Sequence, residues 1–455
     1  MAPSYLAKLA GYARVPTFCL CGAGERERAR SLAYSPALRM VSSPRHAAVL
    51  VAVGAFPPEL QAPARRVHDQ LPTPSGVVHW APSGEPPFPE AERVAAAKDP
   101  TSAIVAAFRR ALAGEQQAPV FGPAKNPVDW QGKGPHGQGG KGMMGGTPYG
   151  RSMAMTGDDL RDGLALDRLS LELGPFLPWL PPGTRLSVTV QGDLIESLEL
   201  RVPGLVKPDL AEVFLEGSRH PVRIADVEVA RAKHHLAATA DLLHFLGLFD
   251  LAARAYRLAI SNAPTAATEV HALGRRLRRS LGLRLATRGV GVLPREALVA
   301  TGSVARAAGR RDDVRLADPA YKRLGFEPLL REAGDVEARW QLRIAEAAQA
   351  LELAQSAGDE QHDPAYPLEG PRGALGSTAR SPLGDALVHF APGSVWDEFV
   401  TTLVSLDLDP ATLSPTEEEE SSDDSDTTAH GGHESHADDG GDSSKHDHPG
   451  RRAPD

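Results

Sequence analysis

Two cysteines are the strongest potential metal ligands in the chain, and they lie close together as Cys19 and Cys21. An ordinary cubane iron–sulfur cluster takes four thiolates, and so does a Cys-only zinc site, so two cysteines complete neither. They also exclude a disulfide framework. We therefore expect no metal or cluster held by this chain alone. Small buried side chains are expected at Cys19 and Cys21, the alternative being a metal shared with a partner chain.

Histidines are the second class of potential ligand, but those in the body of the chain show no HExxH or comparable spacing. Five more lie in the C-terminal segment 416–455, at His430, His433, His436, His446 and His448. Beside carboxylates, such side chains can bind zinc, nickel or copper weakly. We favour a disordered acidic tail instead, because this segment combines high charge with low hydrophobicity.

The acidic excess of the chain belongs to the same segment. The formal net charge is -9, but 13 of the 58 acidic residues and 3 of the 49 basic ones fall within 416–455. The remaining 45 acidic and 46 basic residues nearly cancel, so net charge gives no reason to expect nucleic-acid binding. No apolar stretch reaches the roughly 18 residues that span a bilayer, and no signal peptide is recognisable. A soluble, cytoplasmic chain is expected, with no direct membrane span.

Charged side chains at helical spacing could form ion pairs or take part in proton transfer. Glu228 and Arg231 are three residues apart, which suits an ion pair, and His235 follows one turn later. These groups could belong to a proton path or a cavity, but packing and hydrogen bonding between helices is the interpretation that we prefer. The same choice between a coupling role and structural pairing applies to Arg306, Asp313, Arg315, Asp335, Arg339 and Arg343.

A glycine-rich segment, 131–150, holds nine glycines in twenty residues. Such loops can cradle phosphates, but a P-loop needs Gly, four residues, then Gly-Lys-Ser/Thr, and here Lys141 is followed by Gly142. We therefore predict a linker over 115–165.

The elements around these residues predict two folded regions. Over 1–114, the apolar run VLVAVG (49–54), a helical connection and GVVHW (76–80) form a βαβ pattern, and a helix closes the region at Gly114. This region is predicted to be an α/β domain with a parallel sheet.

Over 166–415, the pattern predicts a small antiparallel β region followed by a mainly α-helical domain. Alternation on both sides of Gly192-Asp193 predicts a hairpin. Helical periodicity follows over 228–260, interrupted near Gly247, then over 267–283, over 334–358 and around 395–406. The tail, 416–455, completes the predicted organisation.

Several segments resemble proteins of respiratory complex I and the membrane-bound nickel–iron hydrogenases. SPRHAAVLVAVG (43–54) and RRVHDQLPTPSGVVHW (65–80) are similar to motifs of the small subunit that holds the cluster nearest the quinone. The helical region resembles the large subunit that forms the quinone pocket in complex I and carries nickel and iron in hydrogenases. Its matching segments are the ExxRxxxHL-type helix 228–236, TRGVGV…DPAY at 287–321, 334–346, LEGPRGALG at 368–376 and SLDLDP at 405–410.

This resemblance implies a fusion of small- and large-subunit-like domains in the peripheral arm of an ion-translocating complex with antiporter-like membrane subunits. Ligands of both families are missing, however. Ala411 and Ser414 stand where the large subunit has DPCxxC, and GEPP at 84–87 stands where the small subunit has Gly-Cys-Pro-Pro. The loop GPFLPWLPPG (174–183) lacks both histidines of the GPxHPxxHG loop.

The resemblance with these departures implies a redox-degenerate connecting module, peripherally attached to the membrane through its partner subunits. An iron–sulfur cluster or quinone is expected only with a partner's help. The alternative is an active NADH-quinone oxidoreductase-type subunit that passes electrons to quinone through partner-supplied centres. A third possibility is a metallochaperone that works through the tail.

Overall fold

The structure is a computed structural model that describes residues 10–114 apart from 23 and 85, 156–201 apart from 162, 164 and 165, 210–261, 266–375 apart from 300, and 383–408. All of these belong to one compact unit, 1–414, and the second unit is 415–455. Most of the predicted linker and the whole predicted tail lie outside the described residues, so those two domain assignments stay predictions.

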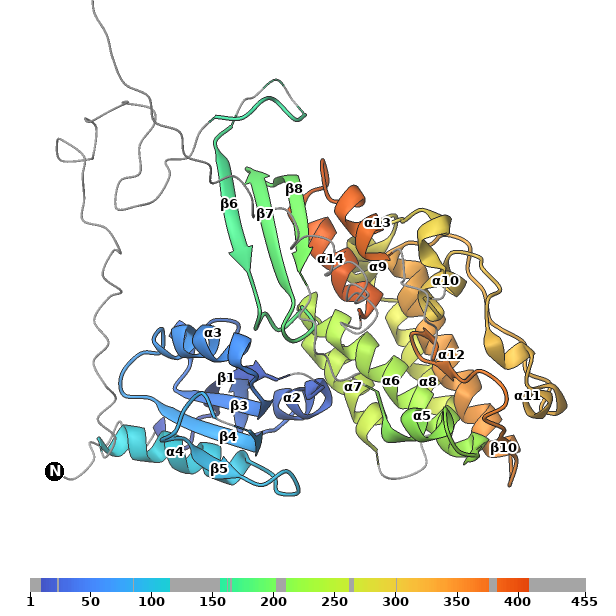
Figure 1. Cartoon of the computed structure of the whole chain (residues 1–455), viewed down its shortest axis with the longest axis horizontal. Coiled ribbons are helices and arrows are strands. Elements are labelled where there is room, and N and C mark those ends of the chain that lie inside the picture. Colours follow the sequence, from blue (N-terminus) through green and yellow to red (C-terminus); the bar gives the residue numbers. More distant parts are fainter. Residues whose placement is uncertain are drawn as a thin grey trace, which may run out of the picture. The chain divides into compact units, whose positions relative to one another are not determined.

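The N-terminal region contains a five-stranded sheet in the order β2-β1-β3-β4-β5, and all its strand pairs are parallel (Figure 1). This confirms the predicted α/β fold. The strands are β1 (Val15–Cys21), β2 (Leu38–Met40), β3 (Val49–Ala55), β4 (Gly76–Ser83) and β5 (Glu92–Val94). The helices are α2 (Arg26–Ala33), α3 (Pro58–His68) and α4 (Thr101–Ala113), with a short 3-10 turn, η1, at Pro44–His46.

The apolar side chains of these strands divide between two cores. Val49, Val51 and Val53 of β3 pack with residues of α2 and α4, whereas Leu50 and Ala52 pack with residues of α3. Because both faces of β3 are covered, the strand is an almost continuous apolar run rather than an alternating one. The helix α4 ends at Gly114, whose φ of 72° is the left-handed conformation that stops a helix.

The three-stranded antiparallel sheet has the order β6-β7-β8. Its strands are β6 (Arg168–Leu173), β7 (Arg185–Gln191) and β8 (Leu194–Arg201). The turn between β7 and β8 falls at Gly192-Asp193, so the predicted hairpin is confirmed. Leu186, Val188 and Ile195 belong to the large core of the helical region, which joins this sheet to the helices.

The helical region is built around α6 (Ile224–Phe245) and α12 (Val336–Ser356). Both helices bury residues on most of their circumference, as expected at the centre of a bundle. The predicted break near Gly247 separates α6 from α7 (Phe249–Ile260), and the predicted end of the long helix near Gly358 is also confirmed. None of the described helices is long and apolar enough to cross a bilayer.

The remaining elements are short. The helices are α5 (Glu212–Gly217), α8 (Ala267–Arg278), α9 (Leu281–Thr287), α10 (Ser303–Ala307), α11 (Pro319–Arg323), α13 (Leu383–Phe390) and α14 (Trp396–Leu406), with 3-10 turns η3 (Arg295–Leu298) and η4 (Val314–Leu316). Two small antiparallel pairs join β9 (Val222–Arg223) to β10 (Gln361–His362) and β11 (Glu369–Gly370) to β12 (Gly373–Ala374).

Candidate functional site

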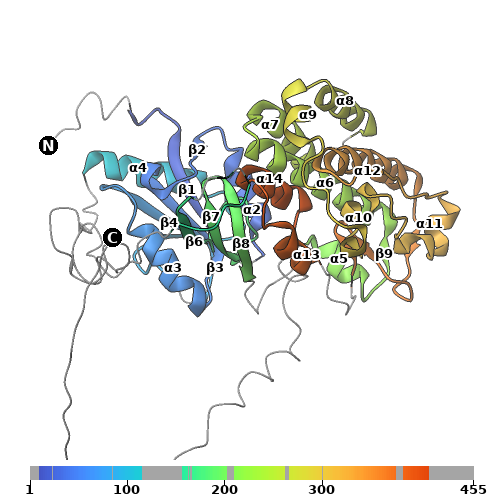
Figure 2. The same cartoon turned by 90° about the horizontal axis from the view of Figure 1, so that it is seen from above.

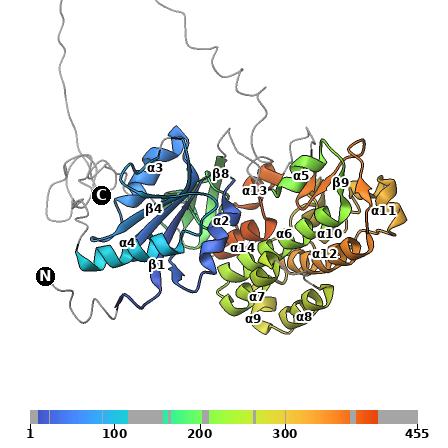
Figure 3. The ribbon, with the colours of Figure 1, turned by 90° about the horizontal axis from the view of Figure 1, so that it is seen from below.

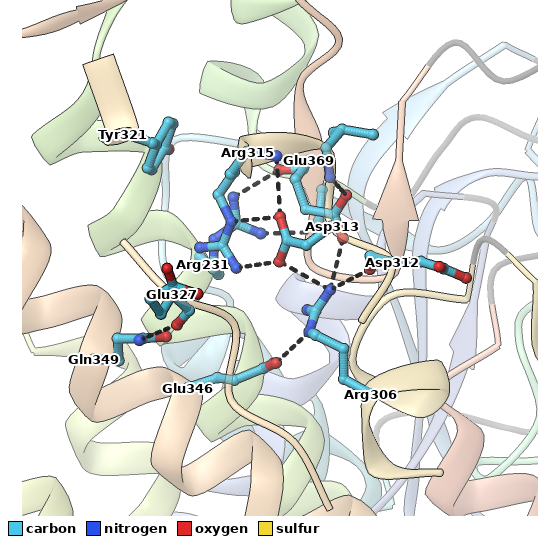
Figure 4. A network of polar contacts seen from close by, with 12 residues as sticks. Arg231, Arg306, Asp312, Asp313, Arg315, Tyr321, Glu327, Glu346, Gln349 and Glu369 are labelled. Carbon is cyan, nitrogen blue, oxygen red and sulfur yellow. Dashed lines mark hydrogen bonds and ion pairs between the residues drawn. The ribbon is translucent and has the colours of Figure 1, made fainter. Parts of the chain in front are cut away.

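A buried charge network lies where α6 and α12 meet the irregular segments between α9 and α12. We define it as Glu228, Arg231, Arg306, Asp313, Arg315, Tyr321, Glu346 and Glu369. Their side chains come from six different elements. Figure 4 labels all of these residues except Glu228. All eight are buried, so each charge needs a partner within the protein.

Glu228 is the junction of the network on α6. It accepts hydrogen bonds from Tyr321 Oη at 2.6 Å, from Arg231 Nε at 3.1 Å and from Arg315 Nη1 at 3.3 Å. Burial alone would raise the pKa of Glu228, but Arg231, Arg315 and the Tyr321 hydroxyl together hold this pKa below its usual value. The expected ion pair of Glu228 with Arg231 is therefore present. Arg231 also donates to the backbone carbonyls of Glu369 and Gly370.

Asp313 is held by two arginines. Arg315 donates to its two carboxylate oxygens from Nε at 3.0 Å and from Nη2 at 2.7 Å, and Arg306 Nη1 lies 3.1 Å from Oδ2. Burial works to raise the pKa of Asp313, but Arg315 and Arg306 lower it to about 2. The Arg315 guanidinium also lies over the Phe326 ring, 4.0 Å from its centroid. Asp313 is thus an anion at any neutral or mildly acidic pH.

Arg306 links the two ends of the network. Its Nε donates to Glu346 Oε1 at 2.6 Å on α12, and its Nη1 lies 3.0 Å from Glu369 Oε1 (Figure 4). Burial, and then the nearby Asp313 carboxylate, raise the pKa of Glu369 above its usual value. The remaining Nη2 of Arg306 is buried without a hydrogen-bond partner among the described residues.

His235 adjoins the network one turn beyond Arg231. Its Nε2 lies 3.3 Å from Glu346 Oε2, but neither ring nitrogen makes a hydrogen bond within the described part of the chain. Burial first, and then His234 and three arginines, hold the pKa of His235 well below its usual value. The imidazole is therefore neutral at pH 7. Arg343 of α12 is one of these three arginines. Burial lowers the pKa of Arg343, although the carboxylates of Asp407 and Glu346 oppose that change.

The other two predicted residues, Asp335 and Arg339, lie outside the network and make their hydrogen bonds near the first turn of α12. Asp335 caps the helix by accepting from Ala338 N at 2.7 Å, and it also accepts from Gly289 N at 2.8 Å. Arg339 donates to Ser405 Oγ at 2.8 Å and to the carbonyls of Gly291 and Gly334. Burial and the neighbouring Arg343 lower the pKa of Arg339 to about 9.

A second ionic cluster was not predicted. Asp407, which follows α14, accepts from His234 Nε2 at 2.6 Å and from Arg372 Nη2 at 3.1 Å, and Arg26 of α2 lies 3.6 Å away. Burial would raise the pKa of Asp407, but Arg372 and His234 hold it well below the usual value. Arg372 lies in LEGPRGALG and Asp407 in SLDLDP, two motif segments whose sequences alone predict no mutual contact.

Four further contacts join α2 and its C-cap to the helical region. Arg30 donates to Asp241 Oδ2 from Nε at 2.9 Å and from Nη2 at 2.7 Å, and Arg26 lies 3.5 Å from the same oxygen. Tyr34 stacks on Tyr256 with the ring centroids 3.8 Å apart. The α/β region is thus connected to α6 and α7 through ionic and aromatic contacts.

The two cysteines lie on β1, a central strand. Cys19 packs against the apolar core beneath α2 and α4, and burial raises the pKa of its thiol to about 12. Cys21 Sγ donates to the carbonyl of Gly22 at 3.4 Å. Among the residues that the structure describes, no group of three or more His, Cys, Asp or Glu side chains could hold a metal ion. The five candidate histidines of 416–455 lie outside those residues.

The loop 174–183 packs its apolar side chains into two cores. Phe176 lies in the core beneath α3, with its ring 5.9 Å from that of Phe56. Leu180 lies in the core of the helical region, and Trp179 contacts Trp396 edge to face with the centroids 6.3 Å apart. These side chains therefore act as packing groups in this structure.

The network as a whole has the chemistry of a structural scaffold. Each of its four carboxylates contacts at least one of its three guanidinium groups. These contacts hold the irregular segments 301–321 and 368–375 against the two central helices. The ring nitrogens of His235 and the Oε2 atom of Glu346 are buried polar atoms without hydrogen-bond partners among the described residues.

Comparison with known proteins gives one family match. Residues 255–380 match the family described as "Respiratory-chain NADH dehydrogenase, 49 Kd subunit". The match includes six of the eight network residues, all except Glu228 and Arg231, and it also includes Arg372. The chain therefore contains a region similar to that subunit, which supports the large-subunit part of the resemblance.

Among solved structures, a chain from "Structure of the membrane-bound sulfane sulfur reductase (MBS), an archaeal respiratory membrane complex" is similar, with 17% identity and a TM-score of 0.41. The similarity covers 55% of the present chain and 99% of the other. No curated protein matches the sequence.

Proposed function

We propose that this chain is a peripheral subunit of a membrane-bound complex related to respiratory complex I, and that it connects subunits rather than carrying electrons. One observation carries the proposal. Six residues of the region that matches the 49 Kd subunit family form a buried charge network with Glu228 and Arg231 of α6. In the sequence resemblance, the positions expected for the families' metal ligands hold other residues.

The missing ligands support the loss of redox centres. By the sequence resemblance, Ala411 and Ser414 stand where nickel and iron would require thiolates, which these side chains cannot provide, and Glu85 stands where a cluster-ligating cysteine is expected. The protonated Cys19 thiol is a poor ligand, because only the thiolate binds metals well. No residue of the chain itself is assigned to a cluster, a nickel–iron centre or a quinone.

The loop 174–183 argues in the same direction. A quinone carbonyl needs a hydrogen-bond donor as it is reduced, and this loop offers apolar and aromatic side chains that pack against Phe56 and Trp396. The loop is thus suited to holding the α/β region, the antiparallel sheet and the helices together. Attachment at the cytoplasmic face of a membrane, through antiporter-like partner subunits, belongs to the same proposal.

Iron analysis on two preparations tests this function. The full chain, produced alone under anaerobic conditions and supplied with iron and sulfide, should retain no stoichiometric iron or acid-labile sulfide. The complex captured from native membranes through a tag on the chain should contain membrane subunits, and alkaline carbonate should release the chain from them.

Two results would contradict the proposal. Stoichiometric iron in the chain alone would show that it carries a centre. Quinone reduction by the captured complex that is abolished by Arg306→Lys, while the complex stays assembled and all partner clusters stay intact, would favour an active oxidoreductase subunit.

A further inference from the structure

An arginine-rich margin distinguishes the α7–α9 part of the helical region from the rest of the chain. Between Phe249 and Val299 the sequence contains nine arginines, no lysine and three acidic residues. Six of the arginines fall within fourteen residues of α8 and α9 and have exposed side chains: Arg275, Arg276, Arg278, Arg279, Arg284 and Arg288. The rest of the body, outside 416–455, is therefore slightly acidic.

Two leucines protrude among these arginines. Leu281 is 67% exposed and Leu285 is 75% exposed, and they lie four residues apart on one face of α9. The opposite face of α9 is already packed, because Leu283 and Thr287 are buried. Gly282, beside Leu281, has open space where a side chain would be. Folding of the described chain thus leaves this apolar pair without a partner. We call these six arginines and two leucines the arginine edge.

The arginines of this edge are largely uncompensated. Arg284 lies 3.8 Å from Glu337. For the other five, no acidic side chain of the described residues lies within 4.0 Å of the guanidinium group. Within the helical region, α7, α8 and α9 lie at one margin, on the side away from α5 and α13 (Figures 2 and 3). A flat partner could approach them from outside.

We propose that the arginine edge binds the surface of an anionic lipid membrane. Guanidinium groups bind phosphate oxygens in a forked geometry, and clusters of four to eight basic residues next to exposed apolar side chains are typical of headgroup binding. Leu281 and Leu285 would enter the boundary between headgroups and acyl chains, as large apolar residues of interfacial helices do. This contact does not depend on whether the chain carries redox centres.

Charge alone would also allow the chain's own acidic segment, 416–455, as the occupant. That segment contains no Leu, Ile, Val, Phe, Met, Trp or Tyr, so it would leave Leu281 and Leu285 exposed. A membrane surface can bind both the arginines and the leucines of the arginine edge, because it offers phosphate groups for the arginines and an acyl-chain region for the leucines. An acidic groove on a partner protein is the remaining alternative, and the experiment below distinguishes it.

Co-sedimentation of the full chain with vesicles tests the proposal. Vesicles of phosphatidylglycerol and phosphatidylcholine should bind the chain, and pure phosphatidylcholine vesicles should bind it at least tenfold more weakly. The triple variant Arg275→Gln, Arg278→Gln, Arg279→Gln and the double variant Leu281→Ser, Leu285→Ser should each lower the partition coefficient about tenfold or more. Added salt should weaken the part of vesicle binding that the arginines provide, because salt screens charges, and it should change the contribution of the leucines much less.

Matched controls come from other exposed positions. Arg201→Gln, Arg219→Gln, Arg311→Gln removes the same charge elsewhere, and Leu169→Ser, Leu171→Ser removes two exposed leucines from β6. Both should bind vesicles within about twofold of the unaltered chain.

Three results would overturn the proposal. The first is failure of the full chain to bind anionic vesicles, including the case in which it binds only after 416–455 is removed. The second is equal loss of binding in the control variants. The third is binding that ignores the leucines and that polyglutamate abolishes, which would indicate an acidic polypeptide as the occupant.

Discussion

Arg315 holds Asp313 in a two-pronged ion pair, with Nε 3.0 Å from Oδ1 and Nη2 2.7 Å from Oδ2. The two residues are only two positions apart, so their pairing stiffens one turn of chain as well as neutralising two buried charges. The same carboxylate lies 3.1 Å from Arg306. Removing its charge would therefore leave two buried guanidinium groups short of a partner, which is far costlier than losing a surface pair.

The variant Asp313→Asn should lower the free energy of unfolding by about 3–5 kcal/mol, measured by urea denaturation at pH 7. Because the pKa of Asp313 is lowered to about 2, its contribution is fully present above about pH 4, the usual value for the unfolded chain. The difference between the two proteins should stay constant from pH 8 to 5 and shrink as the pH falls from 4 towards 2.

The neighbouring Asp312 provides the control. Its side chain is exposed and pairs with Arg310 at the surface, so Asp312→Asn should change the free energy of unfolding by less than about 1 kcal/mol. If both substitutions lowered the free energy of unfolding equally, burial of the Asp313–Arg315 pair would not account for its contribution to stability.

Sequence periodicity predicted the regular elements well and their long-range contacts poorly. The strand at 49–54 and the helices on both sides of Gly247 have strong apolar patterns, and they are present. The strand β1 was missed because proline, threonine and two cysteines interrupt its apolar pattern. Spacing predicted Glu228 beside Arg231, but no local rule places Arg231 against a carbonyl 138 residues later.

His235 should make the stability of the protein depend on pH. Its pKa is held well below the usual value in the folded chain, so only the unfolded chain takes up a proton as the pH falls through about 6.5. Stability is therefore fully present above that pH and decreases below it. In His235→Gln, the slope of unfolding free energy against pH between 6 and 5 should fall by up to about 1.4 kcal/mol per unit.

Other buried histidines contribute to the same slope, so the comparison must be with a matched substitution. His220 is exposed, and His220→Gln is the matched substitution at the surface. A slope that is identical in the His235 and His220 variants would contradict the lowered pKa of His235 in the folded chain.

Gly302 should be irreplaceable by alanine. Its φ is +57°, and an added Cβ would lie 2.5 Å from the backbone nitrogen of Gly373 and 2.7 Å from the carbonyl carbon of Arg372. Gly325 has a similar φ of +68° but open space around it. Gly325→Ala should cost about 1–2 kcal/mol, whereas Gly302→Ala should cost several more, because backbone cannot move aside cheaply. Comparable melting temperatures for the two variants would contradict this close approach.

The thiol of Cys19 should react slowly in the folded chain. Burial raises its pKa to about 12, so at pH 8 almost none of it is the nucleophilic thiolate. In a Cys21→Ser background, which leaves one cysteine, alkylation by iodoacetamide should be at least about a hundredfold slower in buffer than in urea. The same protonation opposes metal binding, since a metal must displace that proton. Rapid alkylation of the native chain, or its suppression by zinc, would identify an accessible thiolate and revive Cys19 as a ligand in a site shared with a partner subunit.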